Sequence, residues 1–389
     1  MFKFNQLKKE IVLGKHCLVR VDFNSSFEKG KLKSSFRIKK TLPLINWLLD
    51  NRAKIILMTH TESESGAIPC LNRLFDFLKQ NYFNDKIYFA NGITDKKTSK
   101  KINDLREGEI LLLDNLRLDA REETNSKDFS RELSSLADIY INEAFSASHR
   151  EHASITGIPK FLPAFPGFNF LAEIENLSKV FRPEHPFLII MGGKKIHTKA
   201  PVIEKFLKTA DHIIAGGLMA VEFYAAQGKK TGKTDIDKSS INLVKEKFLG
   251  KEKIILPEDF TVLRENNRIE VSINEIQDND IVCDIAPCFF DTILDKIFSS
   301  RLILWNGPMG VIEQEFLNGT NKLLYVLKTS KAEIIAGGGE TAEFIEETEA
   351  ADIFSFVSTA GGAMLDFLAE ETLTGIEALR ADKNKKNEI

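Results

Sequence analysis

The chain has 389 residues, which is more than one typical hydrophobic core accommodates and predicts two domains. Its 53 Lys and Arg nearly balance its 56 Asp and Glu, so the formal net charge of -3 excludes a generally basic, nucleic-acid-coating surface, and any anion site must be local. The four cysteines are too sparse for a disulfide framework and lack zinc-type spacing, which indicates a reducing compartment.

The beginning of the chain, MFKFNQLKKE, has no apolar core followed by a small-residue cleavage site. No segment reaches the roughly 18 uncharged apolar residues that a membrane helix needs. We therefore expect a cytoplasmic protein with no nucleic-acid partner and no membrane partner.

Short apolar runs rich in β-branched and aromatic residues recur along the chain, and near-continuous apolarity is typical of strands buried on both faces. In chain order the runs are HCLVRVDF (16–23), AKIILMTH (53–60), EGEILLLDN (107–115), ADIYINEAF (137–145), PFLIIMGG (186–193), DHIIAGGL (211–218), DIVCDIA (280–286), RLILWNGP (301–308), AEIIAGGGE (332–340) and DIFSFVSTAGG (352–362). Amphipathic stretches such as 36–51 and 200–211 lie between most of them, with apolar residues at helical spacing. This alternation predicts an α/β fold with parallel sheets covered by helices.

The residues that follow each predicted strand differ between the two halves of the chain. Ligands of open parallel sheets bind at the carboxyl ends of the strands, so chemistry is expected there. Side-chain cations and amides suit a small, highly charged substrate, whereas glycine-rich turns at helix starts suit polyphosphate held by backbone N–H groups. The first half carries Asp22, Asn24, His60, Asn115, Arg117, His149 and Arg150; the second half carries Gly192, Gly193, Gly216, Gly217, Gly307, Gly337, Gly338, Gly339, Gly361 and Gly362.

Three familiar site motifs are disfavoured. GKKTGKT (228–234) resembles a P-loop, but that motif requires a glycine where Gln227 stands, so a surface loop is the better interpretation. No strand is followed by the G-x-G-x-x-G dinucleotide fingerprint, which disfavours a dehydrogenase. His149 and His152 could share a helix face and bind a metal, but HREH forms no zinc-protease signature, and hydrogen-bonding histidines are favoured.

The segment GGGETAEF (337–344) is more specific. Its glycines let the backbone approach a ligand closely, and Glu340 with Thr341 stands where the next helix begins. The Glu340 carboxylate could cap that helix, or it could hold a Mg²⁺ that bridges nucleotide phosphates. The segment alone leaves both interpretations open.

Taken together, the motifs resemble the phosphoglycerate kinase family, in the family's order and spacing, from about residue 10 to 380. WNGPMGVIE is the most specific of them. The motifs are RVDFN (20–24), FRIKKTLP (36–43), NLR (115–117), EAFSASHREHAS (143–154), GGKKIHTK (192–199), GGLMA (216–220), WNGPMGVIE (305–313), GGGETA (337–342) and STAGGAMLDF (358–367).

The resemblance implies reversible phosphoryl transfer between 1,3-bisphosphoglycerate and ADP, giving 3-phosphoglycerate and ATP, with Mg²⁺ as cofactor and a monomer as the usual state. It also implies two Rossmann-like domains joined by an interdomain helix and closing over the substrates. We expect a phosphoglycerate domain at 1–165, the interdomain helix and linker at 166–183, a nucleotide domain at 184–367, and a segment at 368–389 that returns to the first domain.

The resemblance also implies roles for individual residues. Phosphoglycerate binding falls to Asp22, Asn24, Arg37, His60, Arg117 and Arg150. Nucleotide binding falls to Lys199, Gly216, Gly217, Asn306, Pro308, Glu313, Gly337, Gly338, Gly339, Glu340 and Thr341, with Glu313 on the ribose and Glu340 on Mg²⁺. Arg37, Lys195, Gly361 and Gly362 serve the transferring phosphoryl group. In this interpretation Gly192 and Gly193 clear room for Lys195 and Lys199 to face phosphate oxygens.

One departure from the family is concentrated after His60, where the usual SHLGRP reads THTESE. The family's arginine is therefore missing from the position near Ser63, and that position is flanked by Glu62 and Glu64. Carboxylates that point inward would repel a phosphate, and we expect this loop to be solvated and turned outward.

Two alternatives to an active phosphoglycerate kinase are a kinase for another acyl phosphate and a nucleotide-binding protein that has lost catalysis. Retention of Arg37, Lys195, Lys199, Asn306 and Glu313 favours the active kinase.

Smaller departures put Glu340 where the family has a metal-binding aspartate and Ala360 where a first glycine usually precedes Gly361 and Gly362.

Overall fold

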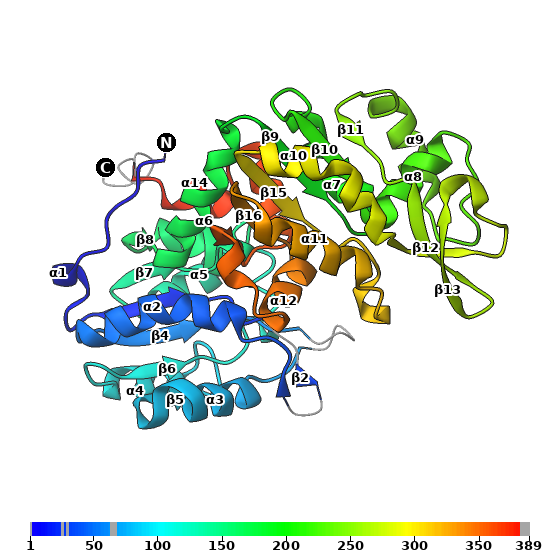
Figure 1. Cartoon of the computed structure of the whole chain (residues 1–389). Helices are drawn as coiled ribbons and strands as arrows, with labels where there is room; N and C mark the ends of the chain where they lie inside the picture. Colours follow the sequence, from blue (N-terminus) through cyan, green and yellow to red (C-terminus); the bar gives the residue numbers. More distant parts are fainter. Residues whose placement is uncertain (1, 25–26, 29–30, 63–67, 382–389) are drawn as a thin grey trace. The chain divides into compact units, whose positions relative to one another are not determined.

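The computed structural model describes residues 2–24, 27–28, 31–62 and 68–381 (Figure 1). The chain forms two compact units. Unit 1 takes the chain up to Glu175 and again from Glu370 onward, and unit 2 is the continuous segment from Asn176 to Ala369. Each unit is built on a sheet of six parallel strands flanked by helices, so the predicted α/β fold is confirmed.

The sheet of unit 1 has the strand order β5-β6-β4-β1-β7-β8. Every neighbouring pair is parallel. The strands are β1 (His16–Arg20), β4 (Lys54–Met58), β5 (Ile87–Phe89), β6 (Ile110–Leu112), β7 (Ile139–Asn142) and β8 (Ala164–Pro166), and a separate antiparallel pair is β2 (Phe27–Glu28) with β3 (Lys31–Leu32). The helices of this unit are α1 (Lys9–Val12), α2 (Phe36–Asp50), α3 (Asn72–Leu78), α4 (Lys96–Asp104), α5 (Lys127–Ser134), α6 (Phe168–Ser178) and α14 (Thr374–Leu379).

The sheet of unit 2 has the order β11-β10-β9-β15-β16-β17. All its pairs are parallel. The strands are β9 (Phe187–Met191), β10 (His212–Ala215), β11 (Ile254–Ile255), β15 (Leu302–Asn306), β16 (Glu333–Gly337) and β17 (Phe356–Val357). The helices are α7 (Ile196–Phe206), α8 (Gly217–Ala226), α9 (Lys238–Lys247), α10 (Leu294–Ser299), α11 (Asn318–Thr329), α12 (Gly339–Glu347) and α13 (Gly362–Glu370).

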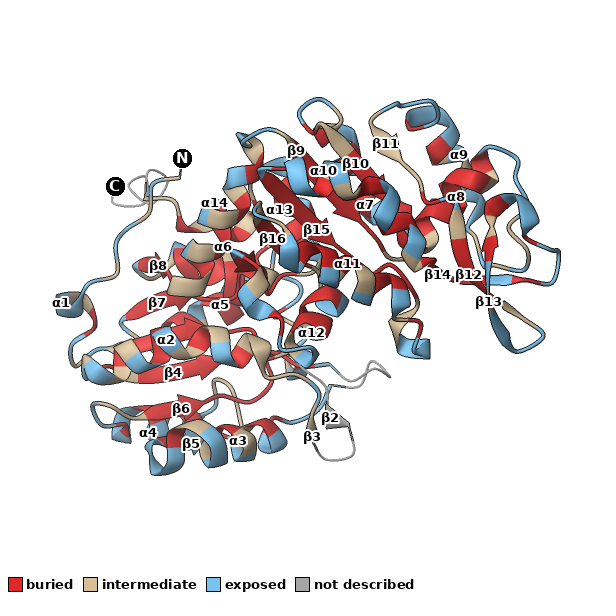
Figure 2. Ribbon diagram, in the orientation of Figure 1, coloured by how far each residue is buried: buried red, intermediate tan, exposed pale blue. Residues whose placement is uncertain are grey.

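The central strands are buried along their length, as their continuous apolar runs predict. Every residue of β9 and β15 is buried, and Figure 2 shows the central strands of both sheets largely in the colour of buried residues. Helices cover these strands with their apolar faces; in α2, for example, Ile38, Leu44 and Leu48 are buried. Burial of apolar side chains between helix and sheet stabilises each unit.

One predicted strand belongs to a different sheet. The run 280–286 forms β14 (Ile281–Ile285), which pairs antiparallel with β12 (Asp259–Arg264), and β12 pairs antiparallel with β13 (Asn267–Ser272). The prediction of a parallel strand at 280–286 is therefore wrong. The apolar run was misleading because most of β14 is buried, as in the parallel strands: Val282 packs in a cluster with Val221 of α8 and Phe260 of β12.

Two predicted helices are found with shifted boundaries. The helix expected at 200–211 begins earlier, at Ile196, because the carboxylate of Glu222 accepts the Ile196 N–H group (3.2 Å) and satisfies that end of α7. The helix expected within 166–183 is α6 (Phe168–Ser178), which is followed by one tight turn. The buried Glu143 carboxylate accepts the N–H groups of Asn169 and Phe170 at its start.

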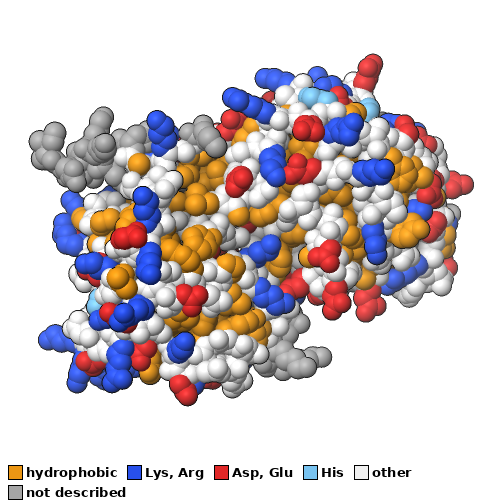
Figure 3. Space-filling view, turned by 60° about the vertical axis from the view of Figure 1, so that its left-hand side comes forward, with side chains coloured by type: hydrophobic (Ala, Val, Ile, Leu, Met, Phe, Trp, Pro, Cys, Tyr) orange, Lys and Arg blue, Asp and Glu red, His pale blue; other side chains and the backbone are white. Residues whose placement is uncertain are grey.

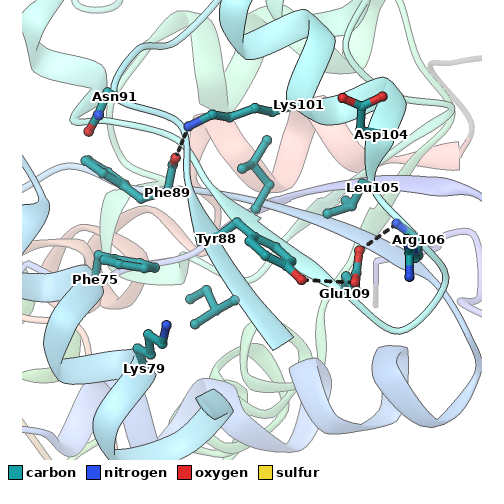
Figure 4. A pocket seen from close by; sticks show the side chains of 12 residues that line it. Phe75, Lys79, Tyr88, Phe89, Asn91, Lys101, Asp104, Leu105, Arg106 and Glu109 are labelled. Carbon is teal, nitrogen blue, oxygen red and sulfur yellow. Dashed lines mark hydrogen bonds between the residues drawn. The ribbon is translucent and has the colours of Figure 1, made fainter. Parts of the chain in front are cut away.

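A pocket of about 660 Å³ lies beside β5, the edge strand of unit 1 (Figure 4). Nζ of Lys101 donates to the carbonyl of Phe89 (2.6 Å), and the hydroxyl of Tyr88 donates to Glu109 (3.1 Å). The rings of Phe75 and Phe89 stack at 5.6 Å. These contacts shield an edge strand that would otherwise offer its backbone to another chain.

Charged side chains of both signs are interspersed on the face drawn in Figure 3, as the near-neutral composition predicts. Among the helices of the described residues, none has the length and apolarity required to cross a bilayer.

Candidate active site

Asp22, Asn24 and Arg37 lie together beyond the carboxyl end of β1. The carboxylate of Asp22 accepts the N–H group of Asn24 (3.0 Å) and the hydroxyl of Ser146, and it pairs with Arg37 Nη1 (2.9 Å). Arg37, from the first turn of α2, also donates to the carbonyl of Asn24 (3.2 Å). Burial disfavours the ionised carboxylate, but the charge of Arg37 and the hydrogen bonds outweigh burial and lower the pKa of Asp22. Asp22 therefore stays ionised and fixes Arg37 at the strand end.

His60 follows β4 and is held by a residue that the sequence interpretation missed. Nη2 of the fully buried Arg20 lies 2.8 Å from Nδ1 of His60. Because arginine can only donate, Nδ1 accepts and the ring carries its proton on Nε2. Burial, and then the charge of Arg20, lower the pKa of His60 well below its ordinary value. A neutral His60 thus presents an N–H donor.

Arg20 is anchored by a buried network. Its Nε donates to the hydroxyl of Ser154 (3.0 Å), which donates to the carboxylate of Glu122 (2.5 Å). The sequence held a signal for this role, because a charged residue inside a strand buried on both faces requires a partner.

Arg117 and Arg150 complete the cluster in unit 1. Asn115 accepts the N–H group of Arg117 (3.1 Å) in the turn after β6, and Arg150 Nε donates to His149 (3.3 Å). Burial, followed by the charges of Arg117 and Arg150, lowers the pKa of His152 to about 4. Arg20, Arg37, His60, Arg117 and Arg150 are hereafter called the arginine cluster. Guanidinium groups gathered in this way suit a small polyanion.

The loop after His60 was expected to be solvated and turned outward, and Glu62 meets only the first half of that expectation. Its side chain is exposed, yet its Oε1 lies 3.4 Å from Nε of Arg117, and Glu123 contacts Nη1 of the same guanidinium. The charge of a buried cation attracts this carboxylate toward the site while the carboxylate keeps contact with solvent. Ser63 and Glu64 lie outside the described residues.

Unit 2 contains a cleft of about 550 Å³ at the carboxyl ends of β9 and β15. Lys199 of α7 is largely buried here, and burial lowers its pKa while the Glu340 and Glu222 charges oppose that shift. The predicted residues among those lining the cleft are Lys195, Lys199, Pro308, Glu313 and Glu340.

Gly192 makes room for the packing of the neighbouring turn and not for the side chains of Lys195 and Lys199. A Cβ at Gly192 would lie 2.1 Å from the carbonyl oxygen of Pro308, and the Gly192 N–H group donates to Asn306 (2.8 Å). Gly193 donates to Pro308 (2.7 Å), and an added Cβ on Gly193 would lie 3.1 Å from Nζ of Lys199. The interpretation that both glycines make room for lysines therefore fits Gly193 and is wrong for Gly192, which makes room for the neighbouring turn.

Several residues that the sequence predicts to bind the nucleotide do not line the cleft. They hold the turns that form its walls. Asn306 Nδ2 donates to the carbonyl of Gly337 (2.9 Å), and Thr341 accepts the N–H group of Gly307 (2.9 Å). Gly216 and Gly217 pack against Met309 and the backbone of Gly193. Gly338 has a φ of 109°, a value that favours glycine, where α12 begins.

The starts of α12 and α13 lie next to each other and are open. A Cβ on Gly361 would come no closer than 3.6 Å to the Gly339 nitrogen, and Gly339 and Gly362 have no neighbouring atom within 4 Å of such a Cβ. Backbone N–H groups at adjacent helix starts favour an anion.

A resident metal centre is not apparent within the described ranges, where no group of three or more His, Cys, Asp and Glu could hold a metal. Two carboxylates, those of Glu313 and Glu340, line the cleft. Because Mg²⁺ is commonly held by one or two carboxylates together with substrate phosphates, Glu340 fits a Mg²⁺ that arrives with a nucleotide.

Comparison with known proteins places these features in one family. The family profile described as phosphoglycerate kinase matches residues 7–371. The phosphoglycerate kinase of Coprothermobacter proteolyticus is 34% identical over 97% of this chain and 99% of its own length, and that of Finegoldia magna is 39% identical over 96% and 98%. The crystal structure of phosphoglycerate kinase from Pyrococcus horikoshii OT3 superposes with a TM-score of 0.88 at 28% identity, covering 99% of this chain and 100% of that one.

Proposed function

The chain belongs to the phosphoglycerate kinase family, and from this membership we propose that the arginine cluster binds the phosphoglycerate and the cleft of unit 2 binds the nucleotide. The protein is a phosphotransferase that moves a phosphoryl group reversibly between 1,3-bisphosphoglycerate and ADP, giving 3-phosphoglycerate and ATP, a step of glycolysis. The proposal assigns the two substrates to different units of the chain.

The buried guanidinium of Arg117 carries the assignment of the acid site. Its Nε and Nη1 are buried and have carboxylate neighbours but, among the described residues, no hydrogen-bond partner. Buried donors of this kind are rare in folded proteins and suit a ligand with acceptor oxygens. The residues proposed to hold the acid are Asp22, Asn24, Arg37, His60, Arg117 and Arg150.

The nucleotide is proposed to lie with its phosphates on Lys199 and its ribose on Glu313, while Glu340 takes the Mg²⁺. That ion, when bound, neutralises charge on the phosphates. Pro308 belongs to the cleft lining, and the residues that support its walls are Gly216, Gly217, Asn306, Gly337, Gly338 and Thr341, while Gly339 stands at the open start of α12.

Phosphoryl transfer mainly requires that the two substrates are aligned and that negative charge on the phosphates is neutralised. No side chain therefore has to act as base or nucleophile. We assign this neutralisation to Arg37 and Lys195 and to the backbone N–H groups at Gly361 and Gly362. We further propose that the protein works as a cytoplasmic monomer, with no nucleic-acid or membrane partner.

A coupled assay tests these assignments by following ATP- and Mg²⁺-dependent phosphorylation of 3-phosphoglycerate while each substrate is varied to saturation. Arg37→Ala and Lys195→Ala are each expected to lower kcat far more than they raise KM for ATP. An equal loss in both parameters would refute the roles given to Arg37 and Lys195.

A further inference from the structure

Glu62 occupies an unusual place in the arginine cluster. Its side chain is 43% exposed, yet Oε1 lies 3.4 Å from Nε of Arg117, whose side chain is only 4% exposed. The carboxylate thus sits at the opening of the site, on the guanidinium that is offered to the acid.

The backbone of Glu62 is tied in place by side chains from other strand ends. Its N–H group donates to Oδ1 of Asn24 (3.2 Å), which follows β1. The preceding residue, Thr61, is held on both sides by Asn115, which accepts its N–H group (3.4 Å) and donates to its carbonyl (2.7 Å). Because Asn115 also accepts the N–H group of Arg117, the same side chain positions both members of the Glu62–Arg117 pair.

The charges of Glu62 and Arg117 affect how a phosphate can bind to this guanidinium. Burial lowers the pKa of Arg117, the carboxylates of Glu62 and then Glu122 oppose that shift, and Arg150 and Arg20 add to it. Glu123 contacts Nη1 of the same guanidinium, whereas Glu62 lies at Nε. Glu62 is therefore one of the carboxylates that stabilise the buried guanidinium, and its electrostatic contribution is the largest among them. A phosphate at the same guanidinium would place two like charges within a few ångströms of each other, and they would repel.

We propose that Glu62 is a resident counter-ion of Arg117, which the incoming phosphate of the acid substrate has to displace, and that Glu62 thereby sets the affinity of the chain for phosphoglycerate. The proposal rests on the proposed function, since it takes the arginine cluster to be the acid site. Glu62 is in this sense a specificity residue that weakens binding of a highly charged acid.

The test replaces Glu62 by its neutral isostere. Glu62→Gln is expected to lower KM for 3-phosphoglycerate about tenfold, equivalent to about 1.4 kcal/mol, with a much smaller change in KM for ATP. Calorimetric titration of the protein with 3-phosphoglycerate alone is expected to show the same gain. The matched control is Glu107→Gln, which makes the same change in charge at the exposed Glu107–Arg52 pair (2.6 Å) and should leave both constants unchanged.

A double-mutant cycle with Arg117→Ala shows whether Glu62 acts through Arg117. The gain from Glu62→Gln should vanish when Arg117 is alanine; an equal gain in both backgrounds would overturn the proposal. If Arg117→Ala raises KM for the acid while Glu62→Gln leaves it unchanged or raises it, the counter-ion role is wrong and the acid site stands. If neither variant alters acid binding, the location of the acid site itself is wrong. Thermal unfolding of each variant establishes that it is folded.

Discussion

Replacing Gly192 by alanine tests the packing of the strand ends in unit 2. The added Cβ would lie 2.1 Å from the carbonyl oxygen of Pro308 and 2.5 Å from that of Gly307. Both are backbone atoms and cannot rotate away as a flexible side chain would. The two turns therefore have to separate, which strains the hydrogen bonds from Gly192 to Asn306 and from Gly193 to Pro308.

The expected loss combines two terms. Overpacking of a well-packed site typically costs about 1–3 kcal/mol. Each weakened hydrogen bond adds about 1 kcal/mol. We therefore expect Gly192→Ala to lower the free energy of unfolding of unit 2 by roughly 3–5 kcal/mol, a large share of the roughly 5–15 kcal/mol that stabilises a typical protein.

Tryptophan fluorescence measures this loss directly. The chain has two tryptophans, and the indole N–H group of the buried Trp305 donates to the carbonyl of Gly307 (2.8 Å), inside the turn that has to move. Trp47 lies in α2 of unit 1, so urea unfolding in a Trp47→Phe background reports on unit 2. Gly339→Ala is the matched control, because an added Cβ there meets no atom within 4 Å. Equal urea midpoints for Gly192→Ala and Gly339→Ala would refute the reasoning.

Three further predictions concern single side chains. Burial raises the pKa of Glu143 to about 8, so the folded protein keeps a proton that the unfolded chain releases near the ordinary pKa of 4.5. The free energy of unfolding should therefore fall by a few kcal/mol as the pH rises from about 5 to about 9, and it should fall less in Glu143→Gln. Identical pH profiles of the urea midpoint for the two proteins would contradict this. Lys199→Met should raise KM for ATP at least about tenfold without a comparable change for 3-phosphoglycerate, and unchanged ATP kinetics would remove Lys199 from the phosphate site. Glu340→Gln should raise the Mg²⁺ concentration needed for half-maximal activity, whereas an unchanged Mg²⁺ titration would argue that Glu340 only caps α12.

Much of the fold could be predicted because parallel strands buried on both faces need continuous apolar runs, which stand out in a sequence. The small antiparallel sheet could not be assigned in the same way, since β14 resembles the parallel strands in composition. A signal for its hairpin was present in the alternation of Phe260 and Val262 with polar neighbours. In the structure this hairpin turns at Glu265 and Asn266, both with positive φ.

The types of residue at the site could be predicted, but their partners could not. Asp22 and Arg37 are 15 positions apart in the sequence, and only the return of α2 to the end of β1 makes them an ion pair. The bond between Arg20 and His60 likewise depends on the pairing of β1 with β4. The sequence predicted that Glu62 would be solvated, and it is, but the contact with the buried Arg117 guanidinium depends on the folded chain and could not be predicted.

Both ends of the described chain meet in unit 1, where the N–H group of Ala381 donates to the carbonyl of Lys3 (3.1 Å). Helix α14 also reaches Ser148, next to the arginine cluster, through the N–H group of Gly375 (2.8 Å) and the hydroxyl of Thr374 (3.1 Å). Unit 2 is one continuous segment, whereas unit 1 is completed only by residues that follow unit 2 in the chain, so during synthesis unit 1 has to wait for them. A chain truncated after Ala369 would therefore contain all of unit 2, but its unit 1 would lack α14 and the contacts of that helix with Ser148.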